Sequence, residues 1–217
     1  MQLRAAIFDF DGTIADTFEE VVRLLNQLST EFGYRAAAPD EIELLRRMTP
    51  GEVATRLGVA WHKIPSIVTR ARKELAHSMP RVQPFDGIPT ALAQLREQGV
   101  RVGLLTSNNR RNVDLFLRGH PITFDFVSTG SGLWGKHRRL AKLMRQYKLT
   151  REHTAYVGDE IRDLEAARTL GVRAVAVEWG YTSRELLAAH APDQLVPQVS
   201  ALAPTLLRIL GEGGVVS

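Results

Sequence analysis

The sequence contains no cysteine among its 217 residues, and this absence excludes several kinds of chemistry. The chain has no disulfide framework, no thiolate metal site and no cysteine nucleophile. Long apolar runs are also missing, because no stretch approaches the roughly 18 residues that a membrane-spanning helix needs. Asp9 and Asp11 interrupt the first apolar run, so we expect no signal peptide. We therefore predict a cytoplasmic protein without a membrane partner.

The composition predicts a folded protein whose mild positive charge suits a small anionic substrate. Hydrophobic residues make up 44% of the chain, and its length suits one α/β core with a modest insertion. The formal charge of +4 is spread along the chain, which does not require nucleic acid. The most basic stretch, 136–151, carries apolar residues at helical spacing, so we expect a solvated helix face and no nucleic-acid partner. The sequence does not indicate an oligomeric state.

The order of apolar patterns predicts an α/β fold. Residues 3–10 form a nearly continuous apolar run, as in a parallel strand that is covered on both faces. After residue 85, strands and helices alternate, which predicts right-handed crossovers and a Rossmann-like, doubly wound parallel sheet. The expected strands are 100–106, 124–128, 154–158 and 172–177, and the expected helices are 89–98, 110–118, 136–147 and 161–170. The last segment, 183–210, is expected to be mostly helical, with a short strand candidate at 193–196.

The segment from residue 17 to residue 79 has a different character. Its apolar residues recur at helical spacing and no strand pattern interrupts them. We predict a helical subdomain, 17–79, that is inserted after the first strand into a core formed by 1–16 and 80–217.

Polar residues follow three of the expected strands. Asp9 and Asp11 end the first strand, Thr106, Ser107 and Asn108 end the second, and Asp159 ends the strand at 154–158, with Asp163 four residues later. Ligands of such sheets bind beyond the carboxyl ends of the strands. We therefore expect these groups to share one pocket.

Three carboxylates in one pocket repel each other unless a proton or a cation lies between them. Oxygen ligands favour a hard cation, for which we expect Mg²⁺, and these stretches contain no histidine or cysteine for zinc. Such a metal with a threonine hydroxyl, backbone amides and a lysine describes a phosphoryl-transfer site. Taken singly, Asp11-Gly12 indicates a turn, Thr106 to Asn108 a helix cap and Lys136 a solvated side chain. Their joint occurrence at successive strand ends favours the catalytic interpretation.

Four motifs in this order resemble those of the haloacid dehalogenase superfamily. They are DFDGT at 9–13, LLTSN at 104–108, Lys136 within GLWGKHRRL, and GDEIRD at 158–163. The resemblance implies a core with a small helical cap of the C1 type at 17–79, and an enzyme most like the phosphoglycolate phosphatases. Because Asp11 is present, the resemblance favours phosphate esters over carbon–halogen bonds.

The resemblance also implies roles for individual residues. Asp9 would be the nucleophile and Asp11 the general acid and base. Mg²⁺ would be held by Asp9, the backbone carbonyl of Asp11 and Asp159, and Asp163 would support it through water or a hydrogen bond to a ligand. The phosphoryl oxygens would be held by Thr106, Ser107, Asn108 and Lys136.

Two segments depart from the family pattern or leave alternatives open. Close relatives often carry Lys-Pro-x-Pro at the third motif, whereas Lys136 is followed by HRRLAK, so Lys142 is the alternative lysine. In the segment 44–52, Arg46, Arg47 and Thr49 would contact the leaving group if it is the cap loop that selects substrate. In the alternative, this loop packs its apolar residues and both arginines are solvated.

The sequence therefore predicts a Mg²⁺-dependent phosphatase that hydrolyses a small phosphomonoester, either 2-phosphoglycolate-like or a sugar phosphate, through an aspartyl-phosphate. The first alternative is a phosphomutase similar to β-phosphoglucomutase. Mutases of this cap type tend to carry a basic residue where this chain has Pro50. The remote alternative is a receiver-like domain that only accepts a phosphoryl group.

Overall fold

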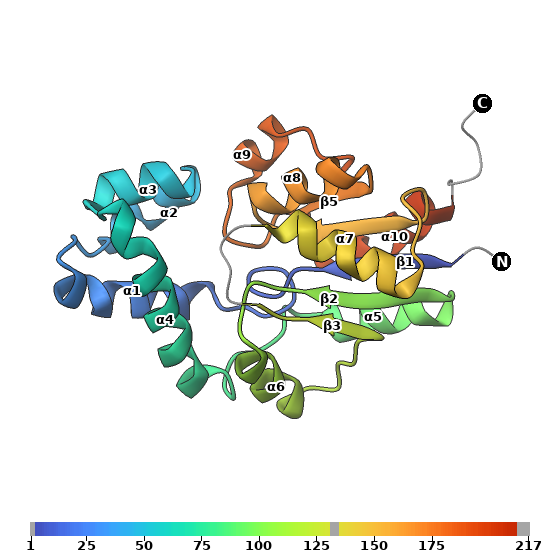
Figure 1. Ribbon diagram of the computed structural model, residues 1–217, viewed down its shortest axis with the longest axis horizontal. Helices are drawn as coiled ribbons and strands as arrows, with labels where there is room; N and C mark the ends of the chain where they lie inside the picture. The colour runs from blue at the N-terminus through green and yellow to red at the C-terminus, as the bar shows by residue number, and fades with distance from the viewer. Residues whose placement is uncertain (1–2, 131–134, 212–217) are drawn as a thin grey trace.

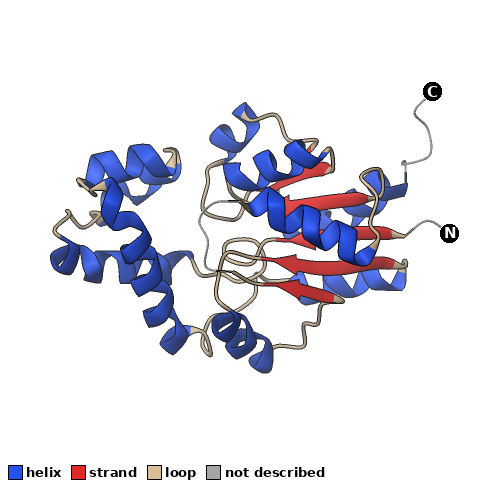
Figure 2. Cartoon of the chain, in the orientation of Figure 1, coloured by secondary structure: helices blue, strands red, loops and turns tan. Residues whose placement is uncertain are grey.

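A parallel sheet of six strands, in the order β3-β2-β1-β4-β5-β6, forms the centre of the molecule (Figures 1 and 2). The computed structural model describes residues 3–130 and 135–211. Residues 132–134 of the third motif therefore lie outside the described residues. The strands are β1 Arg4–Phe8, β2 Val100–Leu105, β3 Phe126–Ser128, β4 Thr154–Gly158, β5 Arg173–Val177 and β6 Gln194–Val196.

Helices cover both faces of the sheet, which confirms the doubly wound prediction. Alternation along β1 explains why both faces are apolar: Ala6 and Phe8 belong to one buried cluster, and Ala5 and Ile7 to the other. The first cluster includes α5, α6 and α10, and the second includes α7, α8 and α9. These helices are α5 Ile88–Glu97, α6 Arg110–Gly119, α7 Lys136–Tyr147, α8 Ile161–Leu170, α9 Arg184–Ala189 and α10 Leu202–Gly211.

The remaining helices lie together beyond the carboxyl ends of the strands, at the left of Figure 1. They fall between β1 and β2 in the chain and pack mainly through α1 and α4, which bury Leu24, Leu28, Ile67 and Leu75. We call them the cap helices: α1 Phe18–Phe32, α2 Ile42–Arg46, α3 Pro50–Leu57 and α4 Ile64–Ser78. The exact division into a core of 1–16 and 80–217 and a cap of 17–79 stays a prediction.

Sequence and structure differ mostly at element ends. The strand predicted at 3–10 ends at Phe8, because the chain then turns through Gly12, whose φ of +75° is in the left-handed region. The region 183–210 divides into α9, β6 and α10. None of the helices in 3–130 or 135–211 is long and apolar enough to cross a membrane.

Candidate active site

The predicted site residues of the core meet at one edge of the sheet. Asp9, Thr106 and Asp159 each come directly after a strand, and all three are buried. The strand order reverses between β1 and β4, where ligands of doubly wound sheets bind. This edge faces the cap helices (Figure 1).

Three buried carboxylates form a cluster at this edge. Asp9, Asp159 and Asp163 each offer an oxygen within 4.8 Å of the others. Burial and the neighbouring acids Glu160, Asp163 and Asp9 raise the pKa of Asp159 well above its ordinary value. Burial also raises the pKa of Asp163 to about 6, although Lys136 opposes this shift. Such a cluster favours a proton or a cation between its members.

The cluster fits a hard divalent cation. All its ligand atoms are carboxylate oxygens, which Mg²⁺ and Ca²⁺ prefer. Asp9 Oδ1 is buried and has no hydrogen-bond partner among the described residues, so one oxygen of the cluster is free to coordinate or to react.

Two glycines allow the backbone to close around Asp159. A Cβ on Gly12 would lie 2.3 Å from Asp159 Oδ2, and one on Gly180 would lie 2.2 Å from Asp159 Cβ. Thr13 Oγ1 donates to Asp159 Oδ1 at 2.7 Å, and the Tyr181 amide donates to Oδ2 at 2.8 Å. Both carboxylate oxygens are therefore oriented. Tyr181 lies on the loop after β5, and its amide reaches the carboxylate of Asp159 from there.

Lys136 joins two members of the cluster. It is the first residue of α7, and its Nζ lies 2.8 Å from Asp9 Oδ2 and donates to Asp163 Oδ1. Tyr156 also donates to Asp163 Oδ1, at 3.3 Å. Burial lowers the pKa of Lys136, but Asp163 and Asp9 outweigh it, and the pKa is raised. Lys142, the alternative lysine, is exposed on the same helix.

Asp11 has a different environment. Its carboxylate accepts from Asn108 Nδ2, 3.0 Å from each oxygen, and from Thr17 Oγ1 at 3.2 Å. Burial and the charge of Asp9 raise the pKa of Asp11 to about 6. A carboxyl with this pKa carries a proton part of the time near neutral pH, as a general acid requires.

The segment from Thr106 to Asn108 is held in a fixed loop. Thr106 Oγ1 accepts from the Asn108 amide at 2.9 Å, and Asn108 Oδ1 accepts from Asn112 Nδ2 at 2.9 Å. Ser107 is buried beside them. The N-cap of α6 is Asn109, whose side chain accepts from the Asn112 amide. The residue that caps α6 is therefore Asn109. Thr106, Ser107 and Asn108 lie before this cap, at the end of β2.

The three cap residues lie in different surroundings. Arg46 Nη2 donates to the Gly180 carbonyl at 2.5 Å, and Arg46 O accepts from the Ser183 amide at 2.9 Å, so this arginine joins the cap to the core. Thr49 caps α3 through a reciprocal pair with Glu52. Arg47 is exposed. Their contact with a leaving group stays a prediction.

Three arginines near the site were not identified from the sequence. Arg139 of α7 is half-buried and donates to the Thr106 carbonyl at 2.6 Å, which corrects its assignment to a solvated helix face. Arg162 of α8 pairs with Glu160 at 2.6 Å. Arg72 of α4 approaches from the cap: burial lowers its pKa, Asp11 raises it, and Arg162 and Arg139 lower it further. The cations of the basic stretch other than Lys136 and Arg139 are exposed, as predicted: Arg138, Lys142, Arg145, Lys148 and Arg151.

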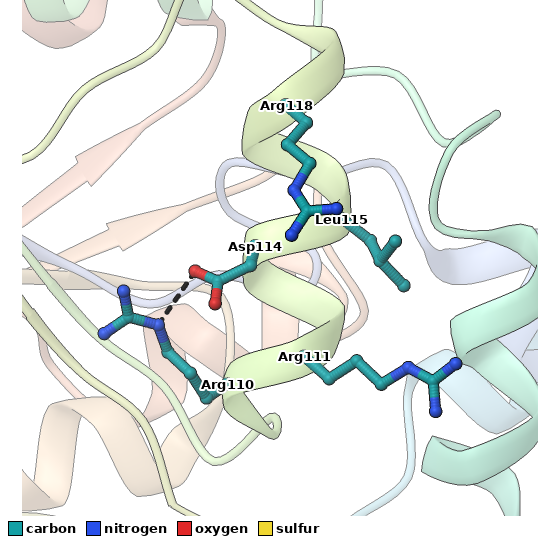
Figure 3. A pocket seen from close by; sticks show the side chains of 5 residues that line it. All are labelled: Arg110, Arg111, Asp114, Leu115 and Arg118. Carbon is teal, nitrogen blue, oxygen red and sulfur yellow. Dashed lines mark hydrogen bonds and ion pairs between the residues drawn. The ribbon is translucent and has the colours of Figure 1, made fainter.

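A separate hollow lies on the outer surface of α6 (Figure 3). It is lined by Arg110, Arg111, Asp114, Leu115 and Arg118, and Arg110 Nε donates to Asp114 Oδ1 at 2.8 Å. Because it contains none of the predicted site residues, we do not assign it to the active site.

Comparisons with known proteins agree with this geometry. Residues 6–177 match the family model described as "Haloacid dehalogenase-like hydrolase". The chain is 34% identical to a phosphoglycolate phosphatase of Synechococcus elongatus, over 96% of this chain and 99% of that protein. It is 26% identical to pyrophosphatase PpaX of Bacillus mycoides, over 97% and 100%. A crystal structure of a predicted phosphatase from Clostridium acetobutylicum shares the fold, with a TM-score of 0.80, 19% identity, and coverage of 96% of this chain and 100% of that one.

Proposed function

Because this chain belongs to the haloacid dehalogenase-like hydrolase family and is a phosphatase, we propose that it hydrolyses a small phosphomonoester, either 2-phosphoglycolate-like or a sugar phosphate, with Mg²⁺ and through an aspartyl-phosphate. The observation that carries this proposal is the difference between the contacts of the two carboxylate oxygens of Asp9. Lys136 lies 2.8 Å from Oδ2, while Oδ1 is buried without a hydrogen-bond partner among the described residues. A carboxylate held in this way presents one oxygen to an incoming phosphorus atom.

In the first step, Asp9 Oδ1 attacks phosphorus, an oxygen–phosphorus bond forms, and the bond from phosphorus to the ester oxygen breaks. Asp11 gives its proton to the departing oxygen. In the second step, Asp11 takes a proton from water, the water oxygen attacks phosphorus, and orthophosphate leaves Asp9. The raised pKa of Asp11, about 6, supports both roles, because both protonation states are accessible near neutral pH.

We propose that Asp9, Asp159 and the main-chain carbonyl of Asp11 hold Mg²⁺, and that Asp163 supports them. When bound, the metal supplies positive charge that stabilises the phosphoryl oxygens. Thr106, Ser107 and Asn108 and the ammonium of Lys136 complete the cradle for these oxygens. Support comes from the raised pKa values in the carboxylate cluster and from its all-oxygen ligands.

A phosphatase is favoured over the two alternatives. Pro50 begins α3, at the place where mutases of this cap type tend to carry a basic residue. A receiver-like domain would lack the helices inserted between β1 and β2, and its phosphorylated aspartate would follow a later strand. Two relatives, a phosphoglycolate phosphatase and a pyrophosphatase, support a small phosphorylated substrate. The cytoplasmic location stays a prediction.

Phosphate release from a panel of esters tests the proposal directly. We expect Mg²⁺-dependent release from at least one of 2-phosphoglycolate, sugar phosphates and nucleoside monophosphates, and loss of release in EDTA. The conversion of one sugar phosphate isomer into another without release of phosphate would instead identify a mutase. Equal rates with Mg²⁺ and with EDTA would contradict the metal proposal.

The stability of the metal-free protein is expected to fall as the pH rises from about 4 to about 6. The pKa values of Asp11 and Asp163 are raised from 3.8 to about 6 in the folded state. Between these values the folded protein keeps protons that the unfolded chain has lost, so acid stabilises folding and this contribution disappears above about 6. Urea unfolding in EDTA at several pH values measures the effect.

Mg²⁺ is expected to raise the unfolding midpoint more at pH 7.5 than at pH 5, because protons and the cation compete for the same carboxylates. Asp159→Asn serves as the control, and in this variant the Mg²⁺ effect should be lost. An equal Mg²⁺ effect at both pH values would show that the cluster is not the binding site.

A further inference from the structure

Three guanidinium groups gather beside the carboxylate cluster, and the proposed chemistry uses none of them. Arg139 lies one turn after Lys136 on α7, and its Nη1 donates at 2.6 Å to the carbonyl of Thr106, the residue that follows β2. Arg162 lies in the first turn of α8, between Asp159 and Asp163 in the chain, and pairs with Glu160. Both side chains therefore lie at the edge of the sheet where the phosphoryl group is expected.

Each of these two guanidiniums has a buried nitrogen without an acceptor. Arg139 Nη2 and Arg162 Nε are buried and have no hydrogen-bond partner within 3–130 and 135–211. More than about nine in ten buried polar groups in folded proteins are hydrogen-bonded, and buried cationic donors that lack an acceptor are especially costly. Two such donors on neighbouring cations indicate a place for an anion.

The third guanidinium comes from the cap. The Arg72 carbonyl accepts from Asn112 Nδ2 at 2.9 Å, and the same amide donates to Asn108 Oδ1. Asn108 in turn donates to Asp11, so the backbone of Arg72 is tied to the loop that holds the general acid. The charges of Asp11, Arg162 and Arg139 all affect the pKa of Arg72, as expected if its guanidinium faces the edge of the sheet at which Arg139 and Arg162 lie.

The acids near these arginines also have other partners, and Asp11 accepts from Asn108 and Thr17. Glu160 pairs with Arg162 at 2.6 Å, and Asp9 and Asp163 are already paired with Lys136. The cap contributes one of the three arginines. The place for an anion between them therefore lies on the side of the site from which a leaving group would extend.

We propose that Arg72, Arg139 and Arg162 form a subsite for a second anionic group of the substrate, a carboxylate or a phosphate, close to the transferred phosphoryl group. This inference rests on the proposed function and narrows its substrate class. Neutral sugar or alkyl phosphates are then poor substrates, and small esters with a second negative charge are good ones. The planar guanidinium forks suit either anion, because both accept paired hydrogen bonds.

Specificity is tested by comparing two esters of similar size, 2-phosphoglycolate and ethyl phosphate, which lacks the carboxylate. The wild type should prefer 2-phosphoglycolate in kcat/KM. In Arg72→Gln and Arg139→Gln this preference should fall by about 10-fold or more, because each variant loses a hydrogen bond between two charged groups. Most of the change should appear in KM for 2-phosphoglycolate. Pyrophosphate, assayed in parallel, distinguishes a phosphate from a carboxylate as the second anion.

Matched controls are available on the same helices. Arg138→Gln on α7 and Arg70→Gln on α4 change exposed arginines and should keep the wild-type preference. Arg139→Lys should restore part of the preference, because it keeps the charge. Arg139 holds the carbonyl of Thr106, whereas Arg72 lies on a different helix, α4, so the Arg72 variant tests the subsite even if Arg139→Gln fails to fold.

The outcomes separate the two proposals. If the wild type hydrolyses both esters and the variants lower both kcat/KM values equally, the arginines act structurally and the subsite is overturned. A wild type that prefers ethyl phosphate over both 2-phosphoglycolate and pyrophosphate also overturns it, while the phosphatase proposal stands. If the wild type releases phosphate from no ester of the wider panel, sugar phosphates included, the phosphatase proposal is overturned as well.

Discussion

Replacing Asp9 by asparagine is expected to lower the rate of phosphate release by about 10⁴- to 10⁶-fold, the range typical for the loss of a nucleophile. The amide oxygen is a poor nucleophile and does not carry the charge that Lys136 holds at 2.8 Å. The aspartyl-phosphate would then not form. Turnover of the best ester with saturating Mg²⁺, measured on wild type and variant prepared in parallel, gives the result.

Trapping the intermediate adds a second measurement. Acid quenching of the wild type during turnover should leave phosphate covalently bound to the protein, and Asp9→Asn should carry none. Asp86→Asn changes an exposed carboxylate and is the matched control, with wild-type turnover expected. If Asp9→Asn kept full Mg²⁺-dependent turnover, another residue would be the nucleophile.

Replacing Lys136 by methionine is expected to affect both stability and activity. Its Nζ contacts two buried carboxylates, Asp9 and Asp163, and loss of one partner of a buried pair costs about 3–5 kcal/mol. The loss of a charged donor to the phosphoryl oxygens should lower kcat by a further factor of about 10²–10³. Urea unfolding and steady-state kinetics measure the two effects separately.

Lys142→Met is the matched control, because Lys142 is exposed on the same helix. Substitutions at such positions usually change the free energy of unfolding by less than about 0.5 kcal/mol. This pair also distinguishes between the two lysines that the sequence offered for the third motif. Loss of activity in Lys142→Met with full activity in Lys136→Met would exchange their roles.

Asp163 illustrates how a residue can be recognised without its contacts being known. Its place in the fourth motif implied, through the resemblance to the family, a supporting role near the metal. In the structure it lies in the carboxylate cluster, and its oxygens also accept from Lys136, Tyr156 and the Glu160 amide. The sequence could not specify these partners, because they come from α7, β4 and the start of α8.

The sequence by itself determined the order of elements and the residues at the strand ends. The predictions for α7, β4 and α8 agree with the observed bounds, because each has strong apolar periodicity and α8 is followed by Gly171, which has a φ of +67°. Local signals of this kind depend only on neighbours along the chain. Asp9 and Asp159 could be identified as members of one pocket once a parallel sheet was inferred, because the carboxyl ends of parallel strands lie at the same edge of the sheet.

Only the tertiary structure decided which charged side chains lie close to one another. Arg72, Arg139 and Arg162 come from three helices, and in the sequence Arg139 looks like its exposed neighbour Arg138. Arg46 reaches Gly180 across the boundary between cap and core, a contact that joins residues 134 positions apart. Electrostatic interactions act through space and depend on burial, so they are decided by how the cap helices and the sheet edge pack together.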